Sequence, residues 1–229
     1  MESTAYTAVV QAPRTPSRAL STDAVVDAAL EIADADGLEA VSLRRLASTF
    51  GVTPMALYRH VRDKDHLLDL MAGRLLDELD VGTEKPSAWQ EELRRLGESF
   101  LALVAAHPSA PFLLSRPFES PGSRRVSVAL LGILDRAGFD PDQAVPLLQA
   151  LTGMLLGPAV HRATYASAAA RKGSRGPTVA AAAEGEPDWP AGEVTSWAAD
   201  PDADRLVVEL WVAGVQGLAA GRARTRAGD

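Results

Sequence analysis

The residues with the clearest chemical potential lie close together, in a segment that runs from residue 44 to residue 64. This segment contains five cations and one acid, for a local charge of +4, whereas the whole 229-residue chain has a net charge of −7. Guanidinium and ammonium groups bind phosphate oxygens, and a guanidinium group also fits the edge of a guanine base. A small basic segment on an acidic chain predicts a protein that touches a polyanion through one limited surface.

Signals for catalysis or for a bound metal are weak. The chain has no cysteine, and its four histidines (His60, His66, His107 and His161) have no metal-ligand spacing with a carboxylate. The sequence contains no nucleophile elbow, phosphate loop or dinucleotide fingerprint. We therefore expect neither an enzyme nor a protein with a cofactor.

The composition favours a soluble cytoplasmic protein. Hydrophobic residues make up 47% of the chain, which is enough for a buried core. No segment is an uninterrupted apolar run of membrane-spanning length. The N-terminus lacks the basic start and the apolar block of a signal peptide, and we expect residues 1–18 to form a disordered polar arm.

Repeated helix-entry patterns must position the basic segment. Ser21, Ser42 and Thr53 are good N-caps, and each follows an apolar residue that can pack against another in the first turn of the helix. Pro54 suits a first helical position, and Gly51 can adopt a positive φ between two helices. Helices are predicted over residues 21–36, 42–50, 53–61 and 63–79.

The second and third of these helices have the proportions of a helix-turn-helix. In the third, Leu57 and Val61 face inward, and the positions that face mostly outward are Pro54, Met55, Tyr58, Arg59 and His60. A helix of about two turns with so much aromatic and cationic surface packs poorly against other helices, but it is suited to reading a DNA groove. A generic αα-hairpin inside a helical bundle is the alternative.

The same residues resemble the DNA-binding domain of the TetR (tetracycline repressor) family. The similar segments, within a match over residues 20–79, are LRRLA (43–47), FGV (50–52), LYRHV (57–61) and KDHLL (64–68). The resemblance implies a recognition helix in the major groove of an operator. The positions that match base-facing residues of the family are Arg44, Thr53, Pro54, Met55 and Ala56. Those that match phosphate-facing residues are Tyr58, His60 and Lys64. Arg59 is added to the predicted DNA contacts because it is a cation on the outward face.

The chemistry of these side chains limits what each can do. Arg44 can present its fork to guanine O6 and N7, or it can be a solvated surface charge. Because Pro54, Met55 and Ala56 offer bases no side-chain hydrogen bond, base reading is expected to depend partly on DNA shape. Thr53 can act as a cap alone, and for His60 a phosphate contact and a structural hydrogen bond remain open.

The rest of the chain predicts a larger all-helical domain. Helices are expected over residues 87–106, 121–137, 140–165 and 202–220, with an irregular stretch over 111–121. Residues 147–160 and the last helix are apolar around most of their circumference, so we expect a second subunit to cover them. Residues 171–201 are predicted to form mostly a flexible loop, either a flap over a pocket or an insertion without a function.

The second domain is more faintly similar to the tetracycline-repressor type of the family, for example at Arg116-Pro117 and Gly138-Phe139. This resemblance implies a homodimer with a four-helix interface and an effector pocket between that interface and the fourth to seventh helices. The tetracycline site itself does not carry over. Asp80 stands where the tetracycline repressors have a drug-binding histidine, and Leu96 stands at the position of their pocket asparagine. Phe112 or Leu114 stands at the position of their magnesium-binding histidine. Only Phe100 and Ser115 match residues of that site.

The expected pocket is therefore largely apolar. Its predicted lining is Leu96, Phe100, Phe112, Ser115, Phe118, Met154 and Trp211. Such a lining suits an apolar or aromatic effector oriented by few polar groups, although each side chain taken singly could equally fill a core.

The sequence thus predicts an all-α protein with an arm (1–18), a helix-turn-helix domain (19–80) and a helical effector-binding and dimerisation domain (81–229). The expected function is repression, with release from a palindromic operator in double-stranded DNA when a small, largely apolar effector binds. A DNA-binding dimeric regulator without an effector is the alternative.

Overall fold

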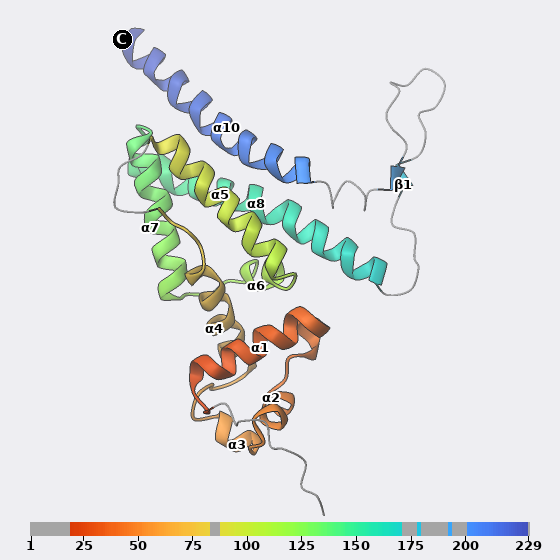
Figure 1. Cartoon of the computed structure of the whole chain (residues 1–229). Coiled ribbons are helices and arrows are strands. Elements are labelled where there is room, and N and C mark those ends of the chain that lie inside the picture. The colour runs from red at the N-terminus through yellow and green to blue at the C-terminus, as the bar shows by residue number, and fades with distance from the viewer. Residues whose placement is uncertain (1–18, 83–87, 171–177, 180–191, 194–200, 229) are drawn as a thin grey trace, which may run out of the picture.

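The computed structural model describes residues 19–82, 88–170, 178–179, 192–193 and 201–228, which form a two-part, almost entirely helical molecule (Figure 1). The first part contains α1 (Thr22–Asp36), the 3₁₀ helix η1 (Leu38–Ala40), α2 (Leu43–Phe50), α3 (Pro54–Leu57) and α4 (Lys64–Asp77). The second contains α5 (Trp89–Ala106), α6 (Ala110–Leu114), α7 (Pro121–Arg136), α8 (Pro141–Ala170) and α10 (Pro201–Gly228). Two short strands, β1 (Thr178–Val179) and β2 (Gly192–Glu193), pair antiparallel. The predicted all-α class is confirmed.

Local capping explains why the first helices begin where they do. The Ser21 hydroxyl accepts a hydrogen bond from the backbone N–H of Ala24 at 3.1 Å, and the Ser42 hydroxyl accepts one from the N–H of Arg45 at 3.2 Å. Each bond satisfies an N–H group that the helix itself leaves unpaired. The helix starts predicted at these two residues therefore agree with the structure.

The turn between α2 and α3 has the geometry of a helix-turn-helix. Gly51 adopts the left-handed conformation with φ of 65°, which a residue with a side chain rarely adopts. Thr53 is the N-cap of α3, but its side chain makes no capping hydrogen bond, and Pro54 begins the helix. The helix is one turn long, shorter than predicted, and the chain continues through turns to Val61.

The apolar side chains of the first part form one core. The most deeply buried, contributed by all four α-helices and the turns between them, are Val25, Ala29, Val41, Leu46, Leu57, Val61, Leu67, Met71 and Leu75. Burial of this kind supplies about 25 cal/mol per Å² of apolar surface, and it holds the short α3 against α2 and, through Leu57, in this core.

The second part departs from the predictions in several places. The stretch predicted to be irregular contains α6, a five-residue helix too short to show a helical period. The last two long helices run beyond their predicted ends, to Ala170 and Gly228, and α5 begins at Trp89. The loop predicted over residues 171–201 lies outside the described residues, apart from the two short strands and Pro201, which begins α10.

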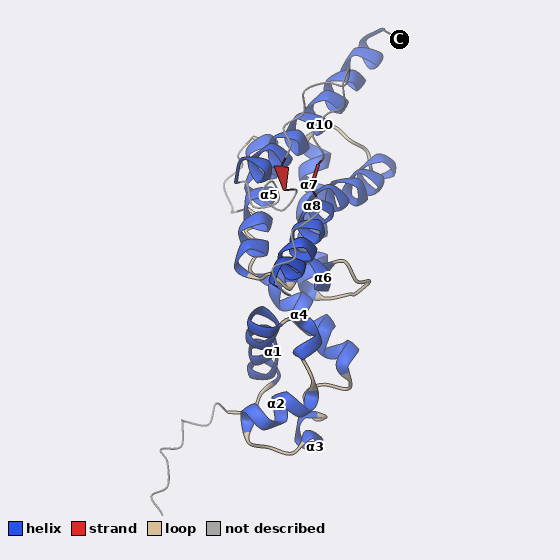
Figure 2. Ribbon diagram, turned by 90° about the vertical axis from the view of Figure 1, so that its right-hand side faces the viewer, coloured by secondary structure: helices blue, strands red, loops and turns tan. Residues whose placement is uncertain are grey.

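Helix α4 connects the two parts. Figures 1 and 2 place α2 and α3 at one end of the molecule and α5, α8 and α10 at the other, with α4 between them. It packs against α1 in its own part and against α6 and α7 in the second. These contacts of α4 therefore link α6 and α7 to the first part.

Candidate nucleic-acid interface and ligand cavity

Helix α3 lies at one end of the molecule (Figure 2), and it exposes large side chains. Met55 is 75% exposed and Tyr58 is 51% exposed, although both are large and partly apolar. The neighbouring Leu57 and Val61 are fully buried, so the helix is held rigidly while its outer face remains open. An exposed apolar face on a firmly seated short helix is typical of a surface that binds a partner.

Exposed cations precede and follow α3 in the sequence. Arg44 on α2, Arg59 after α3 and Lys64 at the start of α4 are all exposed. The adjacent Arg45 differs, because its guanidinium forms an ion pair with Asp36 at the end of α1. Together with Pro54, Met55 and Tyr58, the three exposed cations form what we call the recognition surface.

The other predicted DNA-contact residues lie beside this surface. Thr53 is exposed, whereas Ala56 and His60 are half-buried. The Nδ1 atom of His60 lies 3.5 Å from the hydroxyl of Thr22 at the start of α1. This contact favours a structural role for that ring nitrogen, and the other ring nitrogen remains available to a ligand.

The second part contains an apolar cavity of about 230 Å³. It lies where α4, α5, α7 and α8 meet, and Trp211 of α10 closes one side. Its lining consists of Leu76, Leu79, Leu96, Phe100, Leu114, Phe118, Ser123, Val126, Ser127, Leu130, Leu148, Thr152, Leu155, Leu156 and Trp211. A concave, mostly apolar site with a few polar groups is the usual form of a small-molecule site.

Four of the seven residues predicted to line a pocket lie on this cavity, namely Leu96, Phe100, Phe118 and Trp211. The other three do not. Met154 is 42% exposed, and Phe112 is half-buried in α6 but does not reach the cavity. Ser115 is exposed, and its hydroxyl donates a hydrogen bond to the carbonyl oxygen of Pro111 at 2.6 Å.

The prediction missed the contribution of α7 entirely. Ser123, Val126, Ser127 and Leu130 are spaced three or four residues apart and share one face of that helix. The spacing was visible in the sequence, but nothing local indicated that this face would meet α5 and α8.

Arg116 connects the cavity wall to the start of α4. Its guanidinium lies 3.5 Å from a carboxylate oxygen of Asp65 and 3.4 Å from one of Asp69. Arg116 follows Leu114 and precedes Phe118, both of which line the cavity. The segment 114–118 therefore supplies both part of the cavity wall and the partner of two α4 carboxylates.

A polar cluster joins α1 directly to the second part. The Nδ1 atom of His107 lies 2.7 Å from Asp34 in α1, and its Nε2 atom lies 3.4 Å from Glu78 at the end of α4. The buried Ser109 donates a hydrogen bond to the other oxygen of Asp34 at 3.0 Å. Both carboxylate oxygens of Asp34 are thus held by the α5–α6 connection.

Helix α7 also forms hydrogen bonds with the C-terminal end of α4. Arg125 of α7 donates hydrogen bonds to the carbonyl oxygens of Leu76 at 2.7 Å and Leu79 at 3.3 Å. These bonds satisfy acceptors that the helix end leaves unpaired, and the cation complements the helix dipole. Gly122 allows the close contact, because a Cβ atom there would lie 2.8 Å from the carbonyl oxygen of Gly73.

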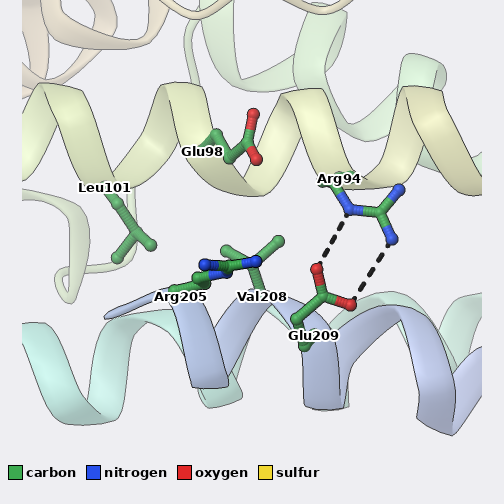
Figure 3. Close-up of a pocket in the computed structure, with 6 residues that line it drawn as sticks. All are labelled: Arg94, Glu98, Leu101, Arg205, Val208 and Glu209. Carbon is green, nitrogen blue, oxygen red and sulfur yellow. Dashed lines mark hydrogen bonds and ion pairs between the residues drawn. The ribbon is translucent and has the colours of Figure 1, made fainter. Parts of the chain in front are cut away.

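A second depression lies between α5 and α10, and its chemistry is different (Figure 3). Arg94 donates two hydrogen bonds to Glu209, at 3.3 and 3.4 Å, and Glu98 and Arg205 lie beside the pair. The hydrogen bonds and the charge of Arg94 lower the pKa of Glu209, and Glu209 raises the pKa of Arg94. Because the charges compensate one another in an open groove, they do not select a charged ligand.

The outer faces of α8 and α10 expose large apolar side chains, namely Val145, Met154, Leu206, Leu210 and Leu218. Residues 141–164 of α8 are long and apolar enough to cross a membrane by length and composition alone, and only 22% of that window is buried. The segment is not an uninterrupted apolar run, because Asp142, Gln149 and Arg162 lie within it. Among the described residues, no group of three or more histidine, aspartate or glutamate side chains could hold a metal ion.

Comparison with known proteins gives two family matches. Residues 25–71 match the bacterial regulatory proteins of the tetR family, and residues 82–202 match the tetracyclin repressor-like C-terminal domain. Among curated relatives, the HTH-type transcriptional repressor DrrR1 of Streptomyces coeruleorubidus is 35% identical over 155 residues, which cover 64% of this chain and 55% of that protein. The class E tetracycline repressor protein of Escherichia coli is 29% identical over 140 residues, 60% of this chain and 66% of that protein. The chain thus spans only about half to two thirds of the length of these relatives.

Solved structures share the fold. The TetR family protein ActR of Streptomyces coelicolor, in complex with actinorhodin, has a TM-score of 0.66 at 25% identity, over 86% of this chain and 95% of that one. BioQ with its double-stranded DNA operator has a TM-score of 0.63 at 21% identity, over 86% and 99%.

Proposed function

The chain belongs to the TetR family of bacterial regulatory proteins, and we propose that it is a homodimeric, cytoplasmic repressor that a small apolar effector releases from its operator. The observation that carries the proposal is the recognition surface, on which Met55 and Tyr58 lie exposed between exposed cations over a fully buried Leu57. Base edges and phosphates in a major groove satisfy such a mixture of apolar and cationic groups.

In this proposal, different residues of the recognition surface have different tasks. Arg44 donates to a guanine, and Met55 and Pro54 contact thymine methyl groups, which carry no hydrogen-bonding capacity. Tyr58, Arg59 and Lys64 contact phosphates, with Lys64 beside the exposed N–H groups at the start of α4. Thr53, Ala56 and one nitrogen of His60 complete the contact.

The outer faces of α8 and α10 support the homodimer. Five large apolar side chains are exposed there, and Gly153, Gly157, Gly214 and Gly217 leave room for a close approach of another helix. Burial of that surface against a second copy accounts for the apolar composition of α8 without a membrane. Two recognition surfaces on a symmetric dimer then meet half-sites about one DNA turn, or ~34 Å, apart.

The cavity supports control by an effector. Leu76 of α4 lines it, as does Leu79 just beyond the helix, while Asp65 and Asp69 at the other end of α4 pair with Arg116. A ligand that binds better to a rearranged cavity moves α4, and with it the spacing of the two recognition surfaces. A coupling free energy of ~1–3 kcal/mol per site is enough to change operator occupancy.

The test is selection of genomic DNA fragments by the purified protein, followed by titration of the enriched fragments at two salt concentrations. We expect enrichment of one inverted repeat, with affinity that falls steeply as salt rises. Weak binding to all fragments without a shared sequence would contradict specific regulation. An operator complex that no small molecule weakens would instead favour the second candidate, a dimeric regulator without an effector.

A further inference from the structure

Among the described residues, the wall of the cavity carries no charged group. Its fifteen lining residues include no Asp, Glu, His, Lys or Arg, and three of them carry hydroxyl groups. Transfer of an unpaired charge into such surroundings is strongly unfavourable, whereas transfer of an apolar ring is favourable. The chemistry of the lining therefore selects an uncharged occupant.

Two of the three hydroxyls already have partners in the protein. Ser123 donates to the carbonyl oxygen of Ser120 at 2.9 Å and accepts from its N–H at 3.0 Å. Thr152 donates to the carbonyl oxygen of Leu148 at 2.8 Å. The indole N–H of Trp211 donates to the carbonyl oxygen of Leu151 at 3.0 Å, so it too is satisfied.

Ser127 is different. Its hydroxyl has no hydrogen-bond partner among the residues that the structure describes, and it lies one turn after Ser123 on the cavity face of α7. Both its donor and its acceptor capacity are therefore available to an occupant. It is half-buried, so a hydrogen bond formed there with a ligand competes only in part with water.

The volume of the cavity indicates the size of the apolar group that it can cover. A cavity of about 150 Å³ holds one benzene ring. The cavity here, at about 230 Å³, has room for one ring with substituents or for two fused rings.

We propose that the cavity binds an uncharged aromatic molecule of one or two rings that carries a hydroxyl or carbonyl group, and that Ser127 orients this group. This proposal names the class of effector for the repressor function proposed above. Only the biological role of the bound molecule rests on that function. Binding itself is a property of the protein without DNA.

The experiment uses the full-length protein without DNA, with calorimetric titration of three matched probes. 1-Naphthol is uncharged and can hydrogen-bond, 1-methylnaphthalene has the same shape without the hydroxyl, and 1-naphthoate carries a charge. We expect 1-naphthol to bind at least about tenfold more tightly than 1-naphthoate, a difference of about 1.4 kcal/mol. Ser127→Ala should weaken 1-naphthol about three- to tenfold and leave 1-methylnaphthalene unchanged. Val128→Ala, at an exposed position on the same helix, should change neither.

The outcomes test the ligand class and the role of the Ser127 hydroxyl separately. Equal binding of 1-naphthoate, or no binding of either uncharged probe, would overturn the assigned ligand class. Equal loss of both uncharged probes in Ser127→Ala would show a packing effect and overturn the role of the hydroxyl. Operator binding is measured in a separate assay, so failure of the repressor proposal would appear as absence of specific DNA binding, whatever the probes do.

Discussion

The recognition surface takes its side chains from one short stretch, residues 44–64, whereas the cavity draws its lining from six helices between Leu76 and Trp211. The first is exposed, cationic and partly apolar, and the second is concave, mostly apolar and lined by residues without charge. The contrast separates two kinds of recognition. Contacts with phosphates are charge-dependent and act almost independently of one another, while binding in an apolar cavity depends on the joint fit of all its walls.

Among the variants that test this contrast, the largest effect on operator affinity is expected at Arg44. Arg44→Ala should lower operator affinity by about tenfold to a hundredfold and relax the preference at one base pair of each half-site, because a bidentate contact with guanine is lost. Titration of operators that carry each base at each position measures both effects. Binding of 1-naphthol should not change.

The adjacent Arg45 provides the matched control. Its guanidinium already pairs with Asp36, so Arg45→Ala should reduce operator affinity much less and should leave the base preference intact. Equal losses for the two variants would show that total charge, and not a base contact, determines specificity.

A smaller effect should distinguish the two regions by their response to salt. Lys64→Ala should weaken operator binding about equally for all sequences and reduce the slope of log affinity against log salt by about one, since one phosphate contact is lost. Affinity for 1-naphthol should be nearly independent of salt. Arg124→Ala, which removes an exposed cation from α7, is the control, and an equal fall in slope there would place phosphate contacts outside the recognition surface.

The contrast also explains what sequence reasoning could predict. Caps, a left-handed glycine and a short apolar period act within a few residues, so α1, α2, α4 and the helix-turn-helix were predictable from residues 21–79 alone. The cavity is formed by contacts between helices distant in sequence, and the period of a single helix does not say which neighbour it meets. Met154 was therefore predicted on the cavity and lies exposed, while Ser127 was not predicted at all.

Communication between the two regions gives a third prediction. Asp34 holds α1 to the second part through His107 and Ser109, yet it belongs neither to the recognition surface nor to the cavity. Asp34→Asn weakens this contact, so operator affinity without ligand and ligand affinity without DNA should change little. The factor by which ligand reduces operator affinity should fall about three- to tenfold, within the range of ~0.5–2 kcal/mol typical of coupling residues.

Titrations of operator with and without saturating ligand measure that factor. Asp142→Asn, at an exposed position in the first turn of α8, is the control. An unchanged factor in Asp34→Asn would mean that coupling does not depend on the contact between Asp34 and the α5–α6 connection.

The smallest effect is expected at the groove between α5 and α10, where charge is present but exposed. Glu209→Gln should leave both operator and 1-naphthol binding unchanged and should barely alter Tm at neutral pH, because solvent screens the pair with Arg94. The pair lowers the pKa of Glu209, so its stabilisation is present above the ordinary pKa of glutamate and is lost as pH falls through the lowered value. The Tm values of the unsubstituted protein and of Glu209→Gln should therefore converge in acid. A loss of Tm at neutral pH larger than for a typical surface pair would mean that this groove, like the cavity, depends on the joint fit of its walls.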